Sequence, residues 1–160
     1  MTEVESRPAH TAHDLVITRE FDAPLERVWR AWTDPEQLVR WFFPDHCKPT
    51  DPSFDVRPGG SYRYTFVGDD GAEHRMRGVF QEIAPCERLV FTHGWANPDG
   101  IVEQDTRVTV TFTEVAKGTR ITMRQVGLET EEGRSSHAEG WGEALDHLAA
   151  LLGEGDASTR

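Results

Sequence analysis

Apolar and polar residues alternate along much of the chain, beginning with LVITREF at 15–21. Leu15, Ile17 and Phe21 fall on one side of that segment, which is the period-two pattern of a strand with one buried face. Further strands are expected at 53–56, 61–67, 73–83, 87–95, 105–115 and 119–126. Short turns join the later segments, which predicts consecutive antiparallel hairpins in a sheet of about seven strands.

Three other segments repeat apolar residues at the 3.6-residue period of a helix. The first runs from Pro24 to about residue 33. The second begins at Asp34, whose side chain can accept a backbone N–H while Gln37 reaches back, and it ends at Pro44. The third is a long amphipathic helix from about residue 134 to about residue 152, and its apolar stripe needs a partner as large as the sheet.

Length and charge set the class of protein. The 160 residues are expected to form one domain at 14–153, with flexible tails at 1–13 and 154–160. The formal net charge is −11 and no run of Lys or Arg offsets it, which argues against nucleic acid and membrane surfaces as partners. No secretory signal and no apolar run of about 18 residues is recognised, which predicts a cytoplasmic protein.

Motifs for metals, nucleophiles and phosphates are lacking from the pattern. Cys47 and Cys86 are expected to be free thiols, since neither belongs to a CxxC and the cytosol is reducing. His46 adjoins Cys47, and adjacent residues rarely both bind one metal ion. The PGG segment at 58–60 precedes a strand rather than a helix, unlike a phosphate-binding loop. We therefore expect no metal and no cofactor.

Four segments in fixed order carry a family resemblance. They are ITREFDAPLERVWRAWTDPEQLVRWF from residue 17, GG.Y at 59–62, G.F.EI.P.ERLVFT at 78–92 and GW...LDHL at 140–148. Together they resemble the activator of heat-shock protein 90 ATPase family as found in bacteria, a branch of the START-like (SRPBCC) superfamily, over about 14–153. The resemblance implies an α+β helix-grip fold, in which a curved antiparallel sheet and a long C-terminal helix enclose a cavity.

The same resemblance implies two kinds of partner. The eukaryotic namesake joins this kind of domain to a separate amino-terminal domain that contacts the chaperone, whereas only about 13 residues precede the first strand here. We therefore expect a small apolar molecule as the main partner and carry a chaperone as an alternative. A homodimer is compatible with either.

The aromatic residues of 26–43 divide between the two short helices. Trp29 and Trp32 share the apolar stripe of the first helix and are expected to pack against the sheet. Trp41 and Phe42 end the second helix, and in a helix-grip fold they are expected nearer the cavity mouth, where a ligand or lid role is open.

His93 is the candidate polar group of the cavity. It shares its strand parity with Phe91 and Trp95, so the three side chains are expected on one side of the sheet. If that side faces the cavity, the imidazole can orient a ligand or act as an acid or base near neutral pH. A core histidine satisfied by a neighbouring polar group is the alternative.

Two further patterns concern the cavity. His74 alternates with Arg75 and Arg77, and we expect the arginines on the solvated side because an unpaired buried guanidinium is costly. Gly140 and Gly142 flank Trp141, and each glycine inside a helix costs about 1 kcal/mol relative to Ala, which predicts a close approach of the backbone to the sheet or a ligand. The candidate ligand-binding residues are Trp41, Phe42, Tyr64, Phe66, His74, Phe91, His93, Trp95, Trp141 and Leu145.

Three functions remain open at this point. The first is a binding domain for a small hydrophobic ligand, favoured by the aromatic candidates and the resemblance. The second is a co-chaperone-like interaction domain. The third is a cyclase- or hydrolase-type enzyme that uses a cavity histidine. This hypothesis rests on the analogy of fold alone.

Overall fold

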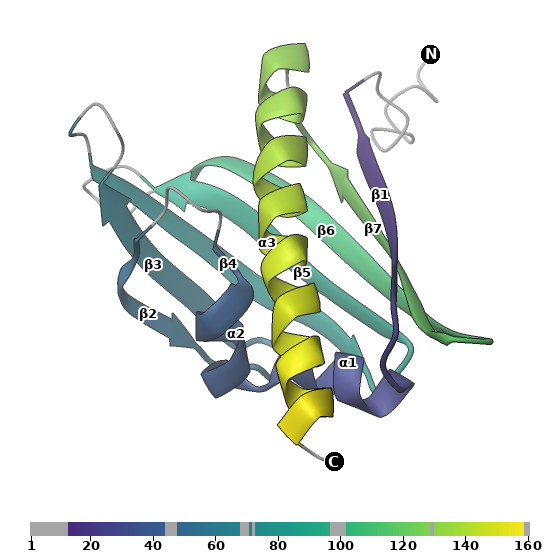
Figure 1. The fold of residues 1–160 in the computed structure, drawn as a ribbon. Helices are drawn as coiled ribbons and strands as arrows, with labels where there is room; N and C mark the ends of the chain where they lie inside the picture. Colours follow the sequence, from purple (N-terminus) through teal and green to yellow (C-terminus); the bar gives the residue numbers. More distant parts are fainter. Residues whose placement is uncertain are drawn as a thin grey trace.

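The computed structural model describes residues 13–43, 48–67, 71, 73–96, 102–128 and 130–158, with side chains over the same ranges except 95–96, 102–105 and 154–158. Its elements (Figure 1) are β1 (Leu15–Phe21), α1 (Leu25–Thr33), α2 (Pro35–Trp41), β2 (Thr50–Phe54), β3 (Ser61–Val67), β4 (Glu73–Ala84), β5 (Arg88–Ala96), β6 (Val102–Val115), β7 (Gly118–Val126) and α3 (Glu131–Ser158).

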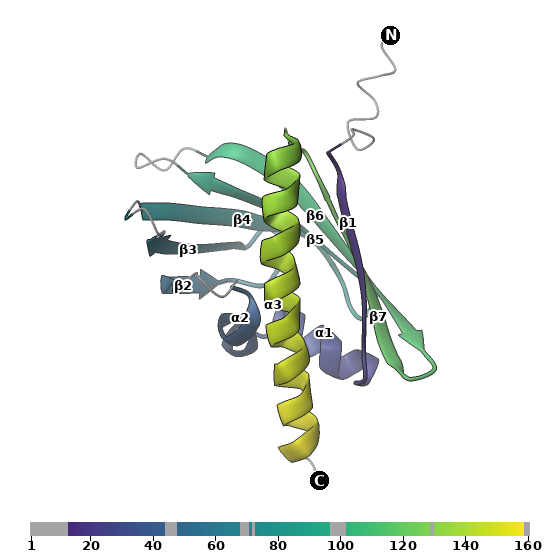
Figure 2. The same ribbon diagram turned by 45° about the horizontal axis from the view of Figure 1, so that its top comes forward.

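The seven strands in the described part of the chain form one antiparallel sheet in the order β1-β7-β6-β5-β4-β3-β2. Strands β2 to β7 follow one another as a meander, as predicted, and β1 returns to pair with β7, where Leu15 lies opposite Gln125. The sheet curves, and α3 crosses its concave face with α1 and α2 at one end (Figures 1 and 2). The predicted α+β helix-grip architecture is therefore confirmed.

Asp34 separates the two short helices, as predicted. Its carboxylate accepts a hydrogen bond from the backbone N–H of Glu36 at 3.0 Å, which satisfies one of the free donors at the start of α2. Gln37 reaches back to the same carboxylate at 3.4 Å rather than to a backbone N–H. The chain thus turns sharply between α1 and α2, which brings their apolar sides against different parts of the core.

The aromatic residues of these helices lie in the core or, in the case of Trp29, are partly buried against it. Trp29 and Trp32 pack edge-on against Phe112 of β6, with ring centroids 5.0 and 6.2 Å away, which confirms the predicted packing against the sheet. Trp41 is fully buried and donates its indole N–H to the carbonyl of Ala31 at 2.8 Å. Phe42 is 4% exposed. The expected place of Trp41 and Phe42 near a cavity mouth is therefore wrong, because α2 packs with its aromatic end inward.

The bounds of some elements differ from those predicted. Helix α3 begins at Glu131, where the Thr130 hydroxyl accepts from the N–H of Gly133 at 2.9 Å, and it continues to Ser158. Its first and last turns lack large apolar residues, so the periodic pattern could not show them. Strand β2 begins at Thr50 and ends at Phe54 rather than spanning 53–56, and it includes Pro52, which an edge strand tolerates.

Gly142 does not mark a close approach to other parts of the protein. A Cβ placed at this residue would have no atom within 4 Å apart from its chain neighbours and the backbone of its own helix. The predicted contact between the helix backbone and the sheet at Gly142 is therefore wrong. The neighbouring Trp141 and Leu145 are buried, so α3 contacts the core through these side chains.

Candidate functional site

The inward side of β5 carries the predicted polar group. Leu89, Phe91 and His93 are 0%, 1% and 6% exposed, so their shared parity does place them on the concave side. The side chain of Trp95 lies outside the described residues. The imidazole of His93 is in ring contact with Trp141 and His137 of α3, with centroids 5.3 and 6.1 Å away. Side chains from the sheet and from the helix thus meet at His93.

Tyr62 of β3 holds the imidazole from the sheet side. Its hydroxyl lies 2.5 Å from Nδ1 of His93 and donates to the carbonyl of Thr92 at 3.1 Å. Because a hydroxyl has one proton, both contacts are satisfied when Nδ1–H of His93 donates to the tyrosine oxygen. That tautomer leaves a lone pair on Nε2 of His93, and no hydrogen bond to Nε2 occurs among the described residues.

Burial keeps His93 uncharged. Loss of hydration, which is the larger cause, and the positive charge that His137 can carry together lower the pKa of the imidazole to about 3. At neutral pH the ring is therefore a neutral hydrogen-bonding group. A general base works best with a pKa near the operating pH, so this pKa disfavours the histidine-based enzyme considered above.

A second polar chain crosses the same region and was missed by the sequence analysis. Trp141 donates its indole N–H to Gln125 at 2.8 Å, Gln125 donates to the hydroxyl of Thr106 at 2.7 Å, and Thr106 donates to the carbonyl of His93 at 2.6 Å. Each member is buried. The sequence did contain a sign of Gln125, because this residue has the same strand parity as Met123, which is a buried residue of β7.

Phe42 is the centre of the aromatic cluster beside His93. Its ring reaches Trp141 of α3 at 5.4 Å and Phe91 of β5 at 6.4 Å, so it joins α2 to both layers. Edge-to-face contacts of this kind add about 0.5–1.5 kcal/mol each beyond the area they bury. The other rings in contact with Phe42 are Trp41, Phe43, Phe54, Tyr62 and Tyr64.

Side chains almost fill the space inside this cluster. A void of about 10 Å³ remains, lined by Trp32, Leu38, Phe42, Phe54, Tyr62, Phe80, Leu89 and Phe91. That volume holds about one water molecule. The indole N–H of Trp32 is buried and has no acceptor among the described residues. In this conformation, therefore, the described part of the site is closed, and it contains one unsatisfied donor.

The remaining candidates lie between the core and the surface. Tyr64 and Leu145 are buried, Phe66 is half-buried and stacks on Tyr64, and His74 is exposed and stacks on Phe66 with centroids 5.0 Å apart. These rings form a path from the surface to the cluster around Phe42. Arg75 and Arg77 lie on the outer side of the sheet, which confirms their predicted solvated face.

Other chemistry is sparse in the described part of the chain. No group of three or more His, Cys, Asp or Glu residues there could hold a metal ion. Cys86 is a free, half-buried thiol, whereas His46 and Cys47 lie outside the described residues. Among the described helices, none combines the length and the apolar character needed to cross a bilayer.

A curved antiparallel sheet that grips one long helix defines the helix-grip class of domains, to which this fold belongs. The profile of the family described as Activator of Hsp90 ATPase homolog 1-like protein matches residues 22–153. The chain therefore belongs to this family. A comparison with curated proteins found no match.

Solved bacterial structures share the fold. The chain is 28% identical to a protein from Nitrosomonas europaea, with a TM-score of 0.74 and coverage of 92% of this chain and 99% of that one. It is 32% identical to a protein from Arthrobacter aurescens, with a TM-score of 0.76 and coverage of 89% and 87%. The AHSA1 protein from Silicibacter pomeroyi is 25% identical, with a TM-score of 0.76 and coverage of 88% and 97%. The fold is thus common to bacterial members of the family.

Proposed function

We propose that this domain binds a small, uncharged, mainly apolar molecule between α3 and the concave face of the sheet, with a hydrogen bond to His93. The observation that carries the proposal is the neutral imidazole of His93, buried among aromatic rings with Nε2 turned away from its tyrosine partner. Buried polar groups in an apolar surrounding are what fixes the orientation of a ligand in such sites.

The chemistry of His93 selects the kind of ligand. With its pKa lowered to about 3, the ring offers no positive charge to an anion at neutral pH. In the tautomer set by Tyr62, Nε2 accepts a hydrogen bond, so the matching ligand carries a hydroxyl or N–H on an apolar body. The aromatic cluster around Phe42 supplies the apolar surface that such a body needs.

A ligand that enters the aromatic cluster around Phe42 needs more room than its described residues leave. The void of about 10 Å³ there is too small for an organic molecule, so we expect rings to rotate or α3 to move away from the sheet. The half-buried rings of Phe66 and His137 lie at the edge of the described core, and we expect entry on their side of α3. Once Phe42 moves, the unsatisfied indole N–H of Trp32 becomes a second hydrogen-bond donor for a ligand in the site.

Two matched probes test the proposal. We expect 1-naphthol, which donates a hydrogen bond, to bind saturably in titration calorimetry and about 10-fold more tightly than 1-methoxynaphthalene, which does not donate one. In His93→Leu the two affinities should become equal, while His74→Gln, which removes an exposed imidazole, should keep the preference. Circular dichroism verifies that each variant folds.

Two results would contradict the proposal. One is the absence of saturable binding of either probe up to its solubility limit. The other is an unchanged preference for 1-naphthol in a folded His93→Leu variant, since the donor would then be recognised elsewhere. Native mass spectrometry of protein taken directly from cells supplies an independent measurement, because a retained ligand adds a discrete mass.

The family description supports a second candidate, a co-chaperone-type interaction. The description names an activator of the Hsp90 ATPase, and the chain matches its profile over 22–153. If the domain acts in this way, adding it to a bacterial Hsp90-type chaperone should raise the rate of ATP hydrolysis at moderate salt. A rate unchanged over a range of domain concentrations would leave ligand binding as the function.

A further inference from the structure

One buried hydrogen-bond donor inside the aromatic cluster has no partner. Trp32 of α1 is 1% exposed, and its indole N–H has no acceptor among the described residues. Two other buried tryptophans of this core differ. Trp41 donates its N–H to the carbonyl of Ala31 at 2.8 Å, and Trp141 donates to the side chain of Gln125, also at 2.8 Å. Since buried N–H groups are nearly always paired in folded proteins, the exception at Trp32 indicates a place for an acceptor that the described chain does not supply.

The side chain of Trp32 borders a void. The void has a volume of about 10 Å³ and lies between the two short helices and strands β2 to β5. Edge-to-face contacts with Trp41 and Phe112, with ring centroids 4.7 and 6.2 Å away, fix the plane of the indole. Its N–H therefore cannot turn toward a partner elsewhere unless these closely packed rings rearrange. The void beside the ring is where an acceptor for this N–H can be placed.

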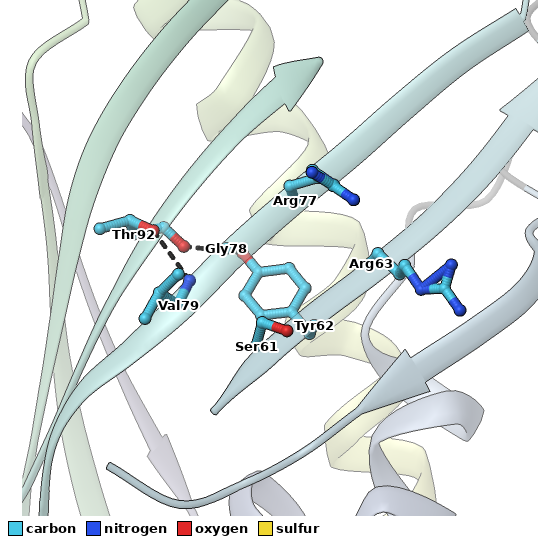
Figure 3. A pocket seen from close by; sticks show the side chains of 7 residues that line it. All are labelled: Ser61, Tyr62, Arg63, Arg77, Gly78, Val79 and Thr92. Carbon is cyan, nitrogen blue, oxygen red and sulfur yellow. Dashed lines mark hydrogen bonds between the residues drawn. The ribbon is translucent and has the colours of Figure 1, made fainter. Parts of the chain in front are cut away.

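Apart from Trp32 itself, the side chains that line the void are apolar with one exception, and none of them is charged. The exception is Tyr62, whose hydroxyl is engaged within the sheet. It donates to the carbonyl of Thr92 at 3.1 Å and lies 2.5 Å from Nδ1 of His93. Figure 3 shows this hydroxyl turned to Thr92 beside Gly78, at a cavity of about 240 Å³ on the other side of the sheet. The tyrosine oxygen is therefore committed to other partners.

A water molecule is a poor match for this void. Its volume admits about one water, but a buried water typically makes about three hydrogen bonds. Among the lining side chains, only the N–H of Trp32 and the engaged hydroxyl of Tyr62 are polar. An acceptor atom that belongs to an apolar molecule needs no further polar partners, because the surrounding rings hold the rest of that molecule. The surroundings of Trp32 therefore favour an organic acceptor over water.

Phe42 lies between the void and the region around His93. Its ring lines the void and is 5.4 Å from the ring of Trp141, which in turn is 5.3 Å from the imidazole of His93. A ligand that takes the place of the Phe42 ring therefore extends from the void toward His93. The indole of Trp32 only donates a hydrogen bond, whereas Nε2 of His93, in the tautomer set by Tyr62, accepts one. One molecule satisfies both groups only if it carries an acceptor and a donor.

We propose that Trp32 forms an acceptor-binding subsite, so that the ligand carries a carbonyl or ether oxygen for the indole N–H as well as a hydroxyl or N–H for His93. The subsite rests on the proposed binding function and narrows the ligand to an uncharged aromatic or other cyclic molecule that bears both groups, such as a hydroxy ketone. A plain hydrocarbon leaves both protein groups unpaired. A carboxylate brings a charge that no side chain lining the void compensates.

The test compares two probes that differ in one substituent. 6-Acetyl-2-naphthol and 6-ethyl-2-naphthol share the hydroxyl and the ring system, whereas only the first has a carbonyl. Trp32→Phe keeps an aromatic ring but has no N–H, and we expect it to lower the ratio of the acetyl affinity to the ethyl affinity by about 10-fold in titration calorimetry. The change in the ratio is the readout, because the probes also differ in polarity. Trp29→Phe, the same substitution on the same helix, is the matched control and should keep the wild-type ratio.

A second measurement needs no variant. The indole N–H signal of Trp32 in NMR spectra, assigned through its ring contact with Trp41, should move downfield on saturation with 6-acetyl-2-naphthol but not with 6-ethyl-2-naphthol. If neither probe binds saturably, the proposed function and the subsite both fail. If both probes bind but the affinity ratio is the same in Trp32→Phe and wild type, or the Trp32 signal responds equally to both, the subsite alone is overturned and ligand binding stands.

Discussion

The strongest prediction concerns the pH dependence of stability that His93 creates. Its folded-state pKa is lowered to about 3, whereas an unfolded chain has the ordinary value near 6.5. Between these two values the unfolded chain binds the extra proton, so stability rises with pH. The contribution is complete above the unfolded pKa and is lost as the pH falls from about 6.5 toward 3.

The magnitude follows from the two pKa values. Each pH unit below about 6.5 lowers the free energy of unfolding by about 1.36 kcal/mol through this one group. Between pH 7.5 and pH 5 the loss through His93 is therefore about 2 kcal/mol, a large part of the stability of a small domain. With a urea slope of about 2 kcal/mol per M, the midpoint should fall by about 1 M from this source.

The measurement compares urea unfolding of wild type and His93→Gln at several pH values. Glutamine keeps a hydrogen-bonding side chain beside Tyr62 but cannot take up a proton, so the pH dependence of the variant should be weaker by about 2 kcal/mol over this range. His74→Gln is the control, since it removes a histidine that is exposed on the neighbouring strand. It should retain the wild-type slope.

Parallel stability curves for wild type and His93→Gln between pH 7.5 and pH 5 would refute this reasoning. A direct NMR titration of the imidazole decides the cause. A protonation midpoint well below 6 in the folded protein is expected, and a midpoint near 6.5 would mean that water reaches the ring. The charge of His137 is the second cause of the lowered pKa, so His137→Gln should raise the protonation midpoint of His93. The rise should be smaller than the one that exposure of the ring to water would produce.

Three further predictions concern packing. Gly78→Ala should destabilise the domain by about 3 kcal/mol, because its Cβ would strike the ring of Tyr62, and a small change in the urea midpoint would show that the strands can separate there. Gly142→Ala should stabilise by about 0.5–1 kcal/mol, since the new methyl meets open space in a helix; a loss of stability would show that the helix is closer to its neighbours. Trp141→Phe should lower the free energy of unfolding by about 1–3 kcal/mol, because it leaves the side-chain carbonyl of Gln125 without a donor. Thermal melts can measure this loss, and the double variant Trp141→Phe/Gln125→Leu, which has no such carbonyl, is the comparison.

Local patterns predicted most of the fold because strand and helix periods are properties of short segments. Asp34 was recognisable as the boundary of the two helices, since its capping interaction lies within three residues. The start of α3 at Glu131 was missed, because a polar first turn gives no periodic signal even though Thr130 caps it. The parity of His93 and Phe91 was also predictable, although which side of the strand faces inward was not.

The candidate site was predicted less well for a physical reason. The polar partners of His93 come from other strands. Tyr62 is 31 residues away on β3, and its hydroxyl reaches the imidazole on β5 across the intervening strand β4. Gln125 and Thr106 join through hydrogen bonds between neighbouring strands. Pattern alone shows these residues only as polar side chains with inward parity, which does not reveal what they touch.

The sequence by itself determined the elements, the antiparallel meander, the family and the side of β5 shared by His93 and Phe91, because these depend on spacing within a segment or on motifs in order. Only the tertiary structure decided that aromatic side chains almost fill the cluster around Phe42, that His93 is held neutral, and that Arg63 lies opposite Arg77 in the register of β3 and β4. Packing volume, hydration and strand register arise when distant segments meet, so no local pattern can specify them.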